Sequence, residues 1–193
     1  MNCCGVCGVF SLFAADENEM RRIVDVNTGE VEWARGEAVL RSLAIGSCVV
    51  IAAYDCQNGI GGMAHVMLPG RASERASEPN RYAANAIDNL LGRMIEAGAN
   101  QPDIEVCLVG AGNVLEKADD AICGQNIRSV TGLLRGKNVA VKGSVLGGTE
   151  RKAVFLDVES GTVTYTRADE KEKLLWKPAT SPQSQQQKYF GKI

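Results

Sequence analysis

The stretch Leu40-Arg-Ser-Leu-Ala-Ile-Gly-Ser-Cys-Val-Val-Ile-Ala-Ala-Tyr-Asp55 decides the fold, because a glycine-serine pair stands between two apolar segments. This pattern predicts a strand, a tight turn at Gly46 and Ser47, and a second, buried strand that follows Cys48 and ends near Asp55. A thiol held at a sharp corner between two core strands is well placed to act as a nucleophile.

A second motif, Gly61-Gly-Met-Ala-His65, lies on the next predicted strand and holds the only histidine of the chain. Imidazole is the side chain whose unperturbed pKa lies close to neutrality, so His65 is the one candidate base for Cys48. A strand and its hairpin return would bring the two residues within reach. The alternative for Cys48 is a buried structural cysteine, which is common; the nearby histidine favours a nucleophile.

A base beside the thiol matters because a free thiol is only a few per cent ionised at neutral pH. A partner that lowers its pKa by ~2 units favours the thiolate by about 2.7 kcal/mol. The imidazole in turn needs an orienting group. Ser42, a hydroxyl in an otherwise apolar run, is the best local candidate for that role.

The backbone near the thiol is expected to complete the site. The N–H groups around Gly46, Ser47 and Val49 are candidates for an oxyanion hole that needs no further side chain. Gly61 and Gly62 are expected to shape the site by letting the backbone come close.

The composition excludes several classes of protein. The 193 residues are 45% hydrophobic and 23% charged, which fits one well-packed domain. A net charge of -2 indicates no binding of nucleic acid or of an anionic membrane, and no apolar run reaches the ~18 to 20 residues of a membrane span. The apolar stretch from Cys3 to Ala15 lacks the basic start and cleavage site of a signal peptide. Seven cysteines without framework spacing favour the reducing cytoplasm.

No cofactor and no metal is expected. Cys3, Cys4 and Cys7 cluster, but the second ligand pair of a structural zinc site is missing. A metal or a redox pair of Cys4 and Cys7 therefore stays open beside unremarkable thiols. The loop Gly110-Ala-Gly-Asn113 lacks the lysine of a phosphate loop, which leaves a tight turn, with a place at the edge of the site as an open alternative.

The pattern of elements predicts an α+β fold, a layered sandwich of mixed or antiparallel β-sheet with flanking helices, because strands outnumber helices and do not alternate strictly with them. The predicted strands are Ala38–Ala44, Val49–Tyr54, Gly62–Leu68, Asp103–Val109, Asn138–Val145, Ala153–Asp157 and Thr162–Thr166. The predicted helices are Arg81–Ala97 and Gly124–Arg135, with a short helix or turn around residues 118–122.

Three regions are expected along the chain. Residues 1–36 are predicted as an N-terminal extension with a small hairpin, Arg22–Val26 and Glu30–Trp33, across an Asn-Thr-Gly turn. Residues 37–170 form the catalytic domain, and residues 171–193 a polar, mobile tail. The tandem Arg-Ala-Ser-Glu repeat at 71–78 is predicted as a solvated loop, with a position at the active-site mouth as the alternative.

The motifs together resemble those of the CheD family, the chemoreceptor glutamine deamidases of bacterial and archaeal chemotaxis. The likeness spans roughly residues 37–166 and rests on the Gly-Ser-Cys and Gly-Gly-Met-Ala-His motifs, the helix after Arg81 and the closing Gly147-Gly148 block. The resemblance implies Cys48 as nucleophile and His65 as general base and acid. The family's third residue is typically threonine six positions before the cysteine, where this chain has Ser42.

The resemblance implies a cytoplasmic protein-glutamine deamidase without a cofactor. Its substrates would be glutamine side chains on the cytoplasmic helices of chemotaxis receptors, converted to glutamate through a thioester on Cys48. Two alternatives follow from the same resemblance: hydrolysis of receptor methyl esters, and a binding module that regulates a CheC-type phosphatase. A pure binder would need no thiol and imidazole together, which favours the enzyme.

Overall fold

The computed structural model describes residues 21–116 and 121–179. Its strands are β1 (Arg22–Asp25), β2 (Val31–Arg35), β3 (Ala38–Ile45), β4 (Val49–Asp55), β5 (Ile60–Val66), β6 (Ile104–Gly110), β7 (Ala140–Leu146), β8 (Lys152–Asp157), β9 (Thr162–Arg167) and β10 (Lys173–Trp176). Its helices are α1 (Ala83–Glu96) and α2 (Ala121–Gly136), with the short 3-10 helices η1 (Pro79–Arg81) and η2 (Gln101–Asp103).

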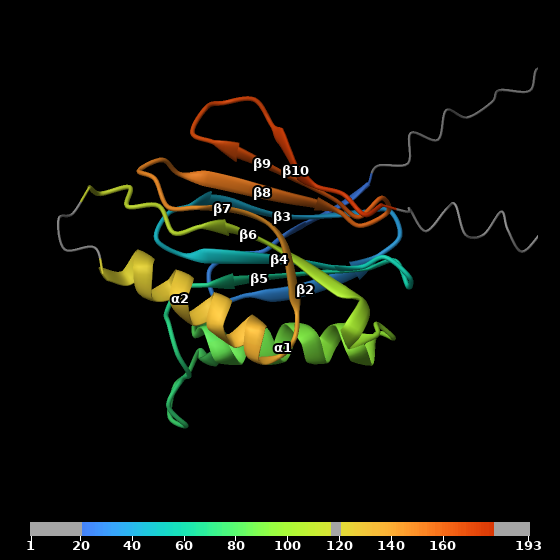
Figure 1. The fold of residues 1–193 in the computed structure, drawn as a ribbon, viewed down its shortest axis with the longest axis horizontal. Coiled ribbons are helices and arrows are strands. Elements are labelled where there is room, and N and C mark those ends of the chain that lie inside the picture. Colours follow the sequence, from blue (N-terminus) through green and yellow to red (C-terminus); the bar gives the residue numbers. More distant parts are fainter. Residues whose placement is uncertain (1–20, 117–120, 180–193) are drawn as a thin grey trace, which may run out of the picture.

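The described strands form two five-stranded sheets, with the orders β1-β3-β8-β9-β10 and β2-β5-β4-β6-β7. Both sheets are mixed, because β1 runs parallel to β3 and β6 parallel to β7 while the other neighbours are antiparallel. The sheets stack face to face, and α1 and α2 cover the outer face of the second sheet (Figure 1). The chain therefore passes from one sheet to the other three times before residue 50, after β1, after β2 and after β3.

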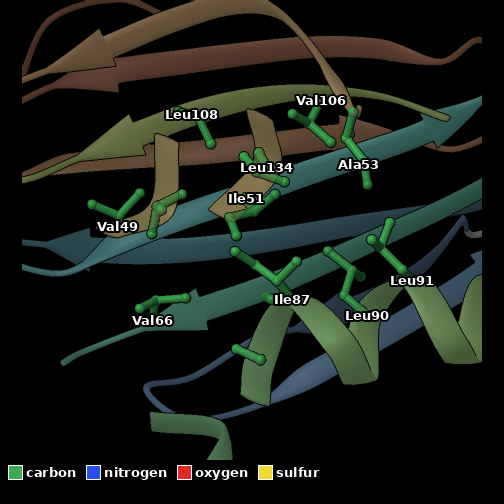
Figure 2. Close-up of a cluster of buried hydrophobic side chains, with 14 of the residues drawn as sticks. Val49, Ile51, Ala53, Val66, Ile87, Leu90, Leu91, Val106, Leu108 and Leu134 are labelled. Atoms are coloured by element: carbon green, nitrogen blue, oxygen red, sulfur yellow. The ribbon is translucent and has the colours of Figure 1, made fainter. Parts of the chain in front are cut away.

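Two apolar clusters hold these layers together. Between the sheets, large side chains such as Leu40, Met63 and Leu156 are fully buried. On the other face of the second sheet, Ile87 and Leu90 of α1 point toward the β4–β5 surface (Figure 2). Burial of each such side chain stabilises the fold by roughly 1.5 to 3 kcal/mol. Because β4 and β5 are buried on both faces, they form the rigid centre from which the site is built.

The α+β layered class is confirmed, and so are the strands predicted from Ala38 onward and the two long helices, with ends that differ by at most three residues. Residues 117–120 lie outside the described part, and Ala121 and Ile122 belong to α2. The Cys3, Cys4 and Cys7 cluster also lies outside the described residues.

The predicted hairpin before Glu37 is wrong. The two strands exist, but β1 pairs in parallel with β3 of the first sheet while β2 pairs antiparallel with β5 of the second. The segment with the Asn-Thr-Gly turn carries the chain from the first sheet to the second, and we call it the passage between β1 and β2. The physical reason is that both strands gain more by completing large sheets than by forming an isolated two-stranded ribbon, which is marginal in water.

Two further segments depart from or refine the expectations. Lys173–Trp176, predicted as the start of a mobile tail, pairs with β9 as β10. The repeat at 71–78 is a loop, as predicted, and its start is anchored on the helices, since the Gly70 N–H donates to Ser129 and Arg71 pairs with Asp88. Among the described helices, none is both long and apolar enough to cross a membrane.

Candidate active site

The corner that carries Cys48 lies in the passage from β3 to β4. The pairing of β3 with β8 shifts register between Ser42 and Ile45, and Ala44 has a left-handed backbone with φ of 54°. Such a bulge bends a strand and redirects its end. The chain then bends through Gly46 and Ser47 into β4, which leaves the thiol half-buried at the predicted corner.

The loop after β6 holds this corner through backbone contacts. The Ala111 N–H donates to the Cys48 carbonyl at 2.6 Å, and the Gly112 N–H donates to the Gly46 carbonyl at 2.8 Å. Gly110 has φ of +133°, and a Cβ there would lie 2.2 Å from the Cys48 carbonyl oxygen. Only glycine permits this approach. The glycine-rich turn therefore lies at the edge of the site, which was one of the two alternatives that the sequence left open.

The imidazole of His65 lies on β5 and is held from the opposite sheet. Its Nδ1 is 2.9 Å from the Oγ of Ser42 on β3, and the Ser42 hydroxyl lies 2.7 Å from the Val26 carbonyl. The same carbonyl is 3.4 Å from Nδ1. A carbonyl only accepts, so the Ser42 hydroxyl donates to Val26 and Nδ1–H donates to Ser42. This arrangement places the proton of the neutral ring on Nδ1 and leaves Nε2 as the free base.

Burial keeps both reactive groups neutral at rest. Burial raises the pKa of the Cys48 thiol, and the Thr28 hydroxyl and the backbone of Cys48 itself act to lower it. Burial also lowers the pKa of His65, against the opposing effects of the Val26 carbonyl and the Glu30 carboxylate. A neutral imidazole is the form that can accept a proton, so the pair is set for general base catalysis.

Thr28 is a site residue that the sequence analysis missed. It lies in the passage between β1 and β2, with its Oγ1 3.5 Å from His65 Nε2, and its hydroxyl acts to lower the pKa of the Cys48 thiol. Within residues 21–116 and 121–179, no hydrogen bond joins Cys48 directly to His65. One hydroxyl therefore interacts with both the predicted nucleophile and the predicted base. Its position inside an expected hairpin turn gave no signal of this role.

Asn126 on α2 is the second missed residue. It is fully buried, and its Nδ2 donates to the carbonyls of Ser47 and Met67, each at 3.0 Å. Ser47 precedes Cys48 and Met67 follows His65 by two residues, so one amide links the two segments that carry the thiol and the imidazole. A signal was present, because Asn126 shares the helical face of the buried Cys123 and Val130.

A cleft of about 380 Å³ opens beside the thiol. Its walls are residues of the corner and of the loop after β6, together with Arg151. Leu115 on its rim is 72% exposed, and Leu43 on the neighbouring β3 is 48% exposed. The cleft is thus lined by a thiol and has apolar side chains at its edge, which suits a side chain presented by a larger partner.

The remaining predicted residues lie at two places, the corner before β4 and the end of β5 away from His65. Gly46 and Ser47 line the cleft with Cys48, and Val49 is the buried first residue of β4. Gly61 and Gly62 lie toward the other end of β5 from His65, where a Cβ would press on Val158 and Leu156 or on Leu90 and Met94. Their close contacts are with the core on both faces of β5.

Among the described residues, no group of three or more histidine, cysteine or acidic side chains is arranged to hold a metal ion. The catalytic candidates of the site are the thiol, the imidazole and the two hydroxyls, together with the backbone N–H groups of the corner. This set can perform nucleophilic attack and proton transfer at an acyl carbon.

Comparison with known proteins identifies relatives of this chain. The profile described as CheD chemotactic sensory transduction matches residues 67–167. The chain is 37% identical over 150 residues to the probable chemoreceptor glutamine deamidase CheD of Chlorobium luteolum, covering 77% of this chain and 75% of that protein. The chain belongs to the CheD family. Proteins of the same description are 30% identical in Haloarcula marismortui, over 76% of this chain and 86% of the relative, and 33% identical in Bordetella avium, over 72% and 62%.

A solved structure, the Bacillus licheniformis hypothetical protein YfiH, aligns with 57% of this CheD-family chain and 44% of its own, at 20% identity and a TM-score of 0.31. That overlap is too slight to bear on function. The matched CheD profile begins two residues after His65, so the roles of Cys48 and His65 rest on the geometry described above.

Proposed function

We propose that this CheD-family protein deamidates glutamine side chains of chemotaxis receptors, with Cys48 as nucleophile and His65 as general base and acid. The observation that carries the proposal is the 2.9 Å contact between Ser42 and His65 Nδ1, because a ring that donates its Nδ1–H to Ser42 keeps Nε2 unprotonated and able to act as a base. Its relatives are named as probable chemoreceptor glutamine deamidases, which supplies the substrate class.

The first half of the reaction forms a thioester. His65 takes the thiol proton, and the Cys48 sulfur attacks the side-chain carbonyl carbon of glutamine as the carbonyl oxygen takes up the electron pair. Backbone N–H groups at the corner, including that of Cys48, would stabilise this oxyanion. When the intermediate collapses, the carbon–nitrogen bond breaks and ammonia leaves with the proton held by His65.

The second half releases glutamate. Nε2 of His65 takes a proton from a water molecule, whose oxygen attacks the thioester carbon. The carbon–sulfur bond then breaks, and the Cys48 thiolate recovers the proton from His65. The new carboxyl group loses its remaining proton to solvent, which adds one negative charge to the receptor helix. The open cleft fits this substrate, since a helix can rest on the rim while one glutamine reaches the thiol.

The proposal is tested on a receptor cytoplasmic fragment, by peptide mass spectrometry after incubation with the full chain. Wild-type protein is expected to produce the mass gain of amide-to-acid conversion at specific glutamines, and Cys48→Ala to leave the fragment unchanged. Cys56→Ala is the matched control, because Cys56 is a half-buried thiol just beyond the other end of β4. Conversion that persists in Cys48→Ala would overturn the mechanism.

The same assay addresses the finer expectations. A fragment that carries glutamate methyl esters tests the methylesterase activity, which would use the same thioester with methanol as the leaving group. Receptor substrates imply a cytoplasmic site of action, which is part of this proposal. Regulation of a CheC-type phosphatase stays a prediction.

A further inference from the structure

The passage between β1 and β2 is built onto the catalytic histidine. The Gly29 N–H donates to the His65 carbonyl at 2.9 Å, and the His65 N–H donates to the Glu30 carbonyl at 3.1 Å. The Glu30 carboxylate closes the passage on itself by accepting from the backbone and side chain of Asn27, at 2.7 and 3.1 Å. These contacts fix the backbone on both sides of Thr28 relative to the imidazole.

The hydrogen bonds that the His65 ring already makes determine which hydrogen bond Thr28 can form with it. Nδ1 already donates to Ser42, so the neutral ring offers Nε2 only as an acceptor. The hydroxyl of Thr28, 3.5 Å away, can donate its one proton to that nitrogen. The same hydroxyl acts to lower the pKa of the Cys48 thiol, and a hydroxyl oxygen has lone pairs that can accept the thiol proton.

We propose that Thr28 is a proton relay between Cys48 and His65 in the deamidation reaction; this inference rests on the proposed function of the two residues. As the thiol proton moves to Thr28 Oγ1, the threonine proton moves to Nε2. The sulfur becomes a thiolate, the ring becomes an imidazolium, and the hydroxyl is restored with its proton turned toward the sulfur. The hydrogen bond from Thr28 then stabilises the thiolate during attack.

The charged groups near the relay are Glu30, Arg81 and Arg151. The Glu30 carboxylate acts on His65 from the same passage, the Arg81 side chain packs beside Gly29, and Arg151 lines the cleft with Cys48 while it donates to the Ala44 carbonyl. In the described part of the chain, none of these three side chains hydrogen-bonds to Cys48 or to the His65 ring. The Thr28 side chain is largely exposed, so its removal changes the chemistry of the site more than the packing of the core.

The test compares Thr28→Val, which keeps the shape and removes the hydroxyl, with Thr28→Ser, which keeps the hydroxyl. The first readout is the rate of iodoacetamide alkylation at Cys48 as a function of pH, followed by mass spectrometry that separates Cys48 from Cys56. We expect Thr28→Val to lower the rate about tenfold at neutral pH, the typical effect of losing one hydrogen bond to a charged group, and to move the midpoint to higher pH. Thr28→Ser is expected to stay within about twofold of wild type.

The second readout is deamidation of the receptor fragment, where Thr28→Val is expected to lower kcat with little change in KM. Unchanged or faster alkylation of Cys48 in Thr28→Val, with thermal unfolding as in wild type, would overturn the relay. If wild-type protein fails to deamidate the fragment while alkylation shows the expected pattern, the proposed function fails and the Thr28 contact with the thiol stands. The two proposals are thus separable.

Discussion

The thiol and the imidazole are positioned by different kinds of contact. Cys48 is held by main-chain hydrogen bonds, with the loop after β6 on one side and Asn126 on the carbonyl before it. His65 is held by side-chain hydroxyls, Ser42 at one ring nitrogen and Thr28 at the other. The thiol is therefore sensitive to added bulk and backbone strain, while the imidazole is sensitive to lost hydrogen bonds. Substitutions near Cys48 and substitutions near His65 should therefore impair the protein in different ways.

Gly110→Ala is expected to have the largest effect, on the thiol side. The new methyl group would meet the Cys48 carbonyl at 2.2 Å with a backbone of φ +133°, so the loop must move away from the corner. We expect a loss of about 2 to 4 kcal/mol in the free energy of unfolding, measured by urea denaturation, and deamidation near background. The matched control is Gly92→Ala on α1, where a Cβ meets no atom within 4 Å; it is expected to gain up to ~1 kcal/mol. Equal stability of the two variants would refute the conclusion that the approach of Gly110 to Cys48 requires a glycine.

Ser42→Ala probes the imidazole side and is expected to be intermediate. Loss of the hydroxyl removes the acceptor of Nδ1–H and the donor to Val26, so the ring can rotate or change tautomer. We expect kcat for deamidation to fall by about ten- to hundredfold with KM nearly unchanged. The control is Ser42→Thr, which keeps the hydroxyl and introduces the threonine that the resemblance to the CheD family implies at this position. Unchanged turnover in Ser42→Ala would remove this residue from the site.

Ala44→Gly is expected to have the smallest effect and separates strain from function on the thiol side. Ala44 has φ of 54°, a conformation that glycine adopts at lower cost. Thermal or urea unfolding should show a gain of about 0.5 to 1 kcal/mol, with deamidation retained. Ala38→Gly in the same strand has no such strain to relieve and is expected to lower stability. A destabilised Ala44→Gly would show that the bulge needs its methyl group.

The sequence was informative where chemistry and local pattern coincide. Cys48, His65 and Ser42 stood out because a thiol after Gly-Ser, a sole histidine and a hydroxyl in an apolar run are unusual within buried strands. The strands from Ala38 to Arg167 and the two long helices followed from periodicity and turn residues. Ser42 and His65 are in contact because the two sheets stack, and no local pattern fixes that contact.

The residues that were missed share one cause. Thr28 lies in a turn whose Asn-Thr-Gly pattern is typical of a hairpin, and local turn chemistry does not reveal that its flanking strands join different sheets. Asn126 falls on the buried face of α2, where a polar side chain indicates a partner but not which one. Leu174 and Trp176 lie in a stretch that reads as polar overall, yet they pair with an existing strand. In each case the deciding contact is distant in sequence.

The bond between Ser42 and His65 joins a strand of one sheet to a strand of the other. The ring is therefore oriented only while the two layers are docked, and the site has no counterpart in a partly unfolded chain. Heat, denaturant or pressure should therefore abolish turnover once the two sheets separate, even where the corner that carries the thiol is still folded.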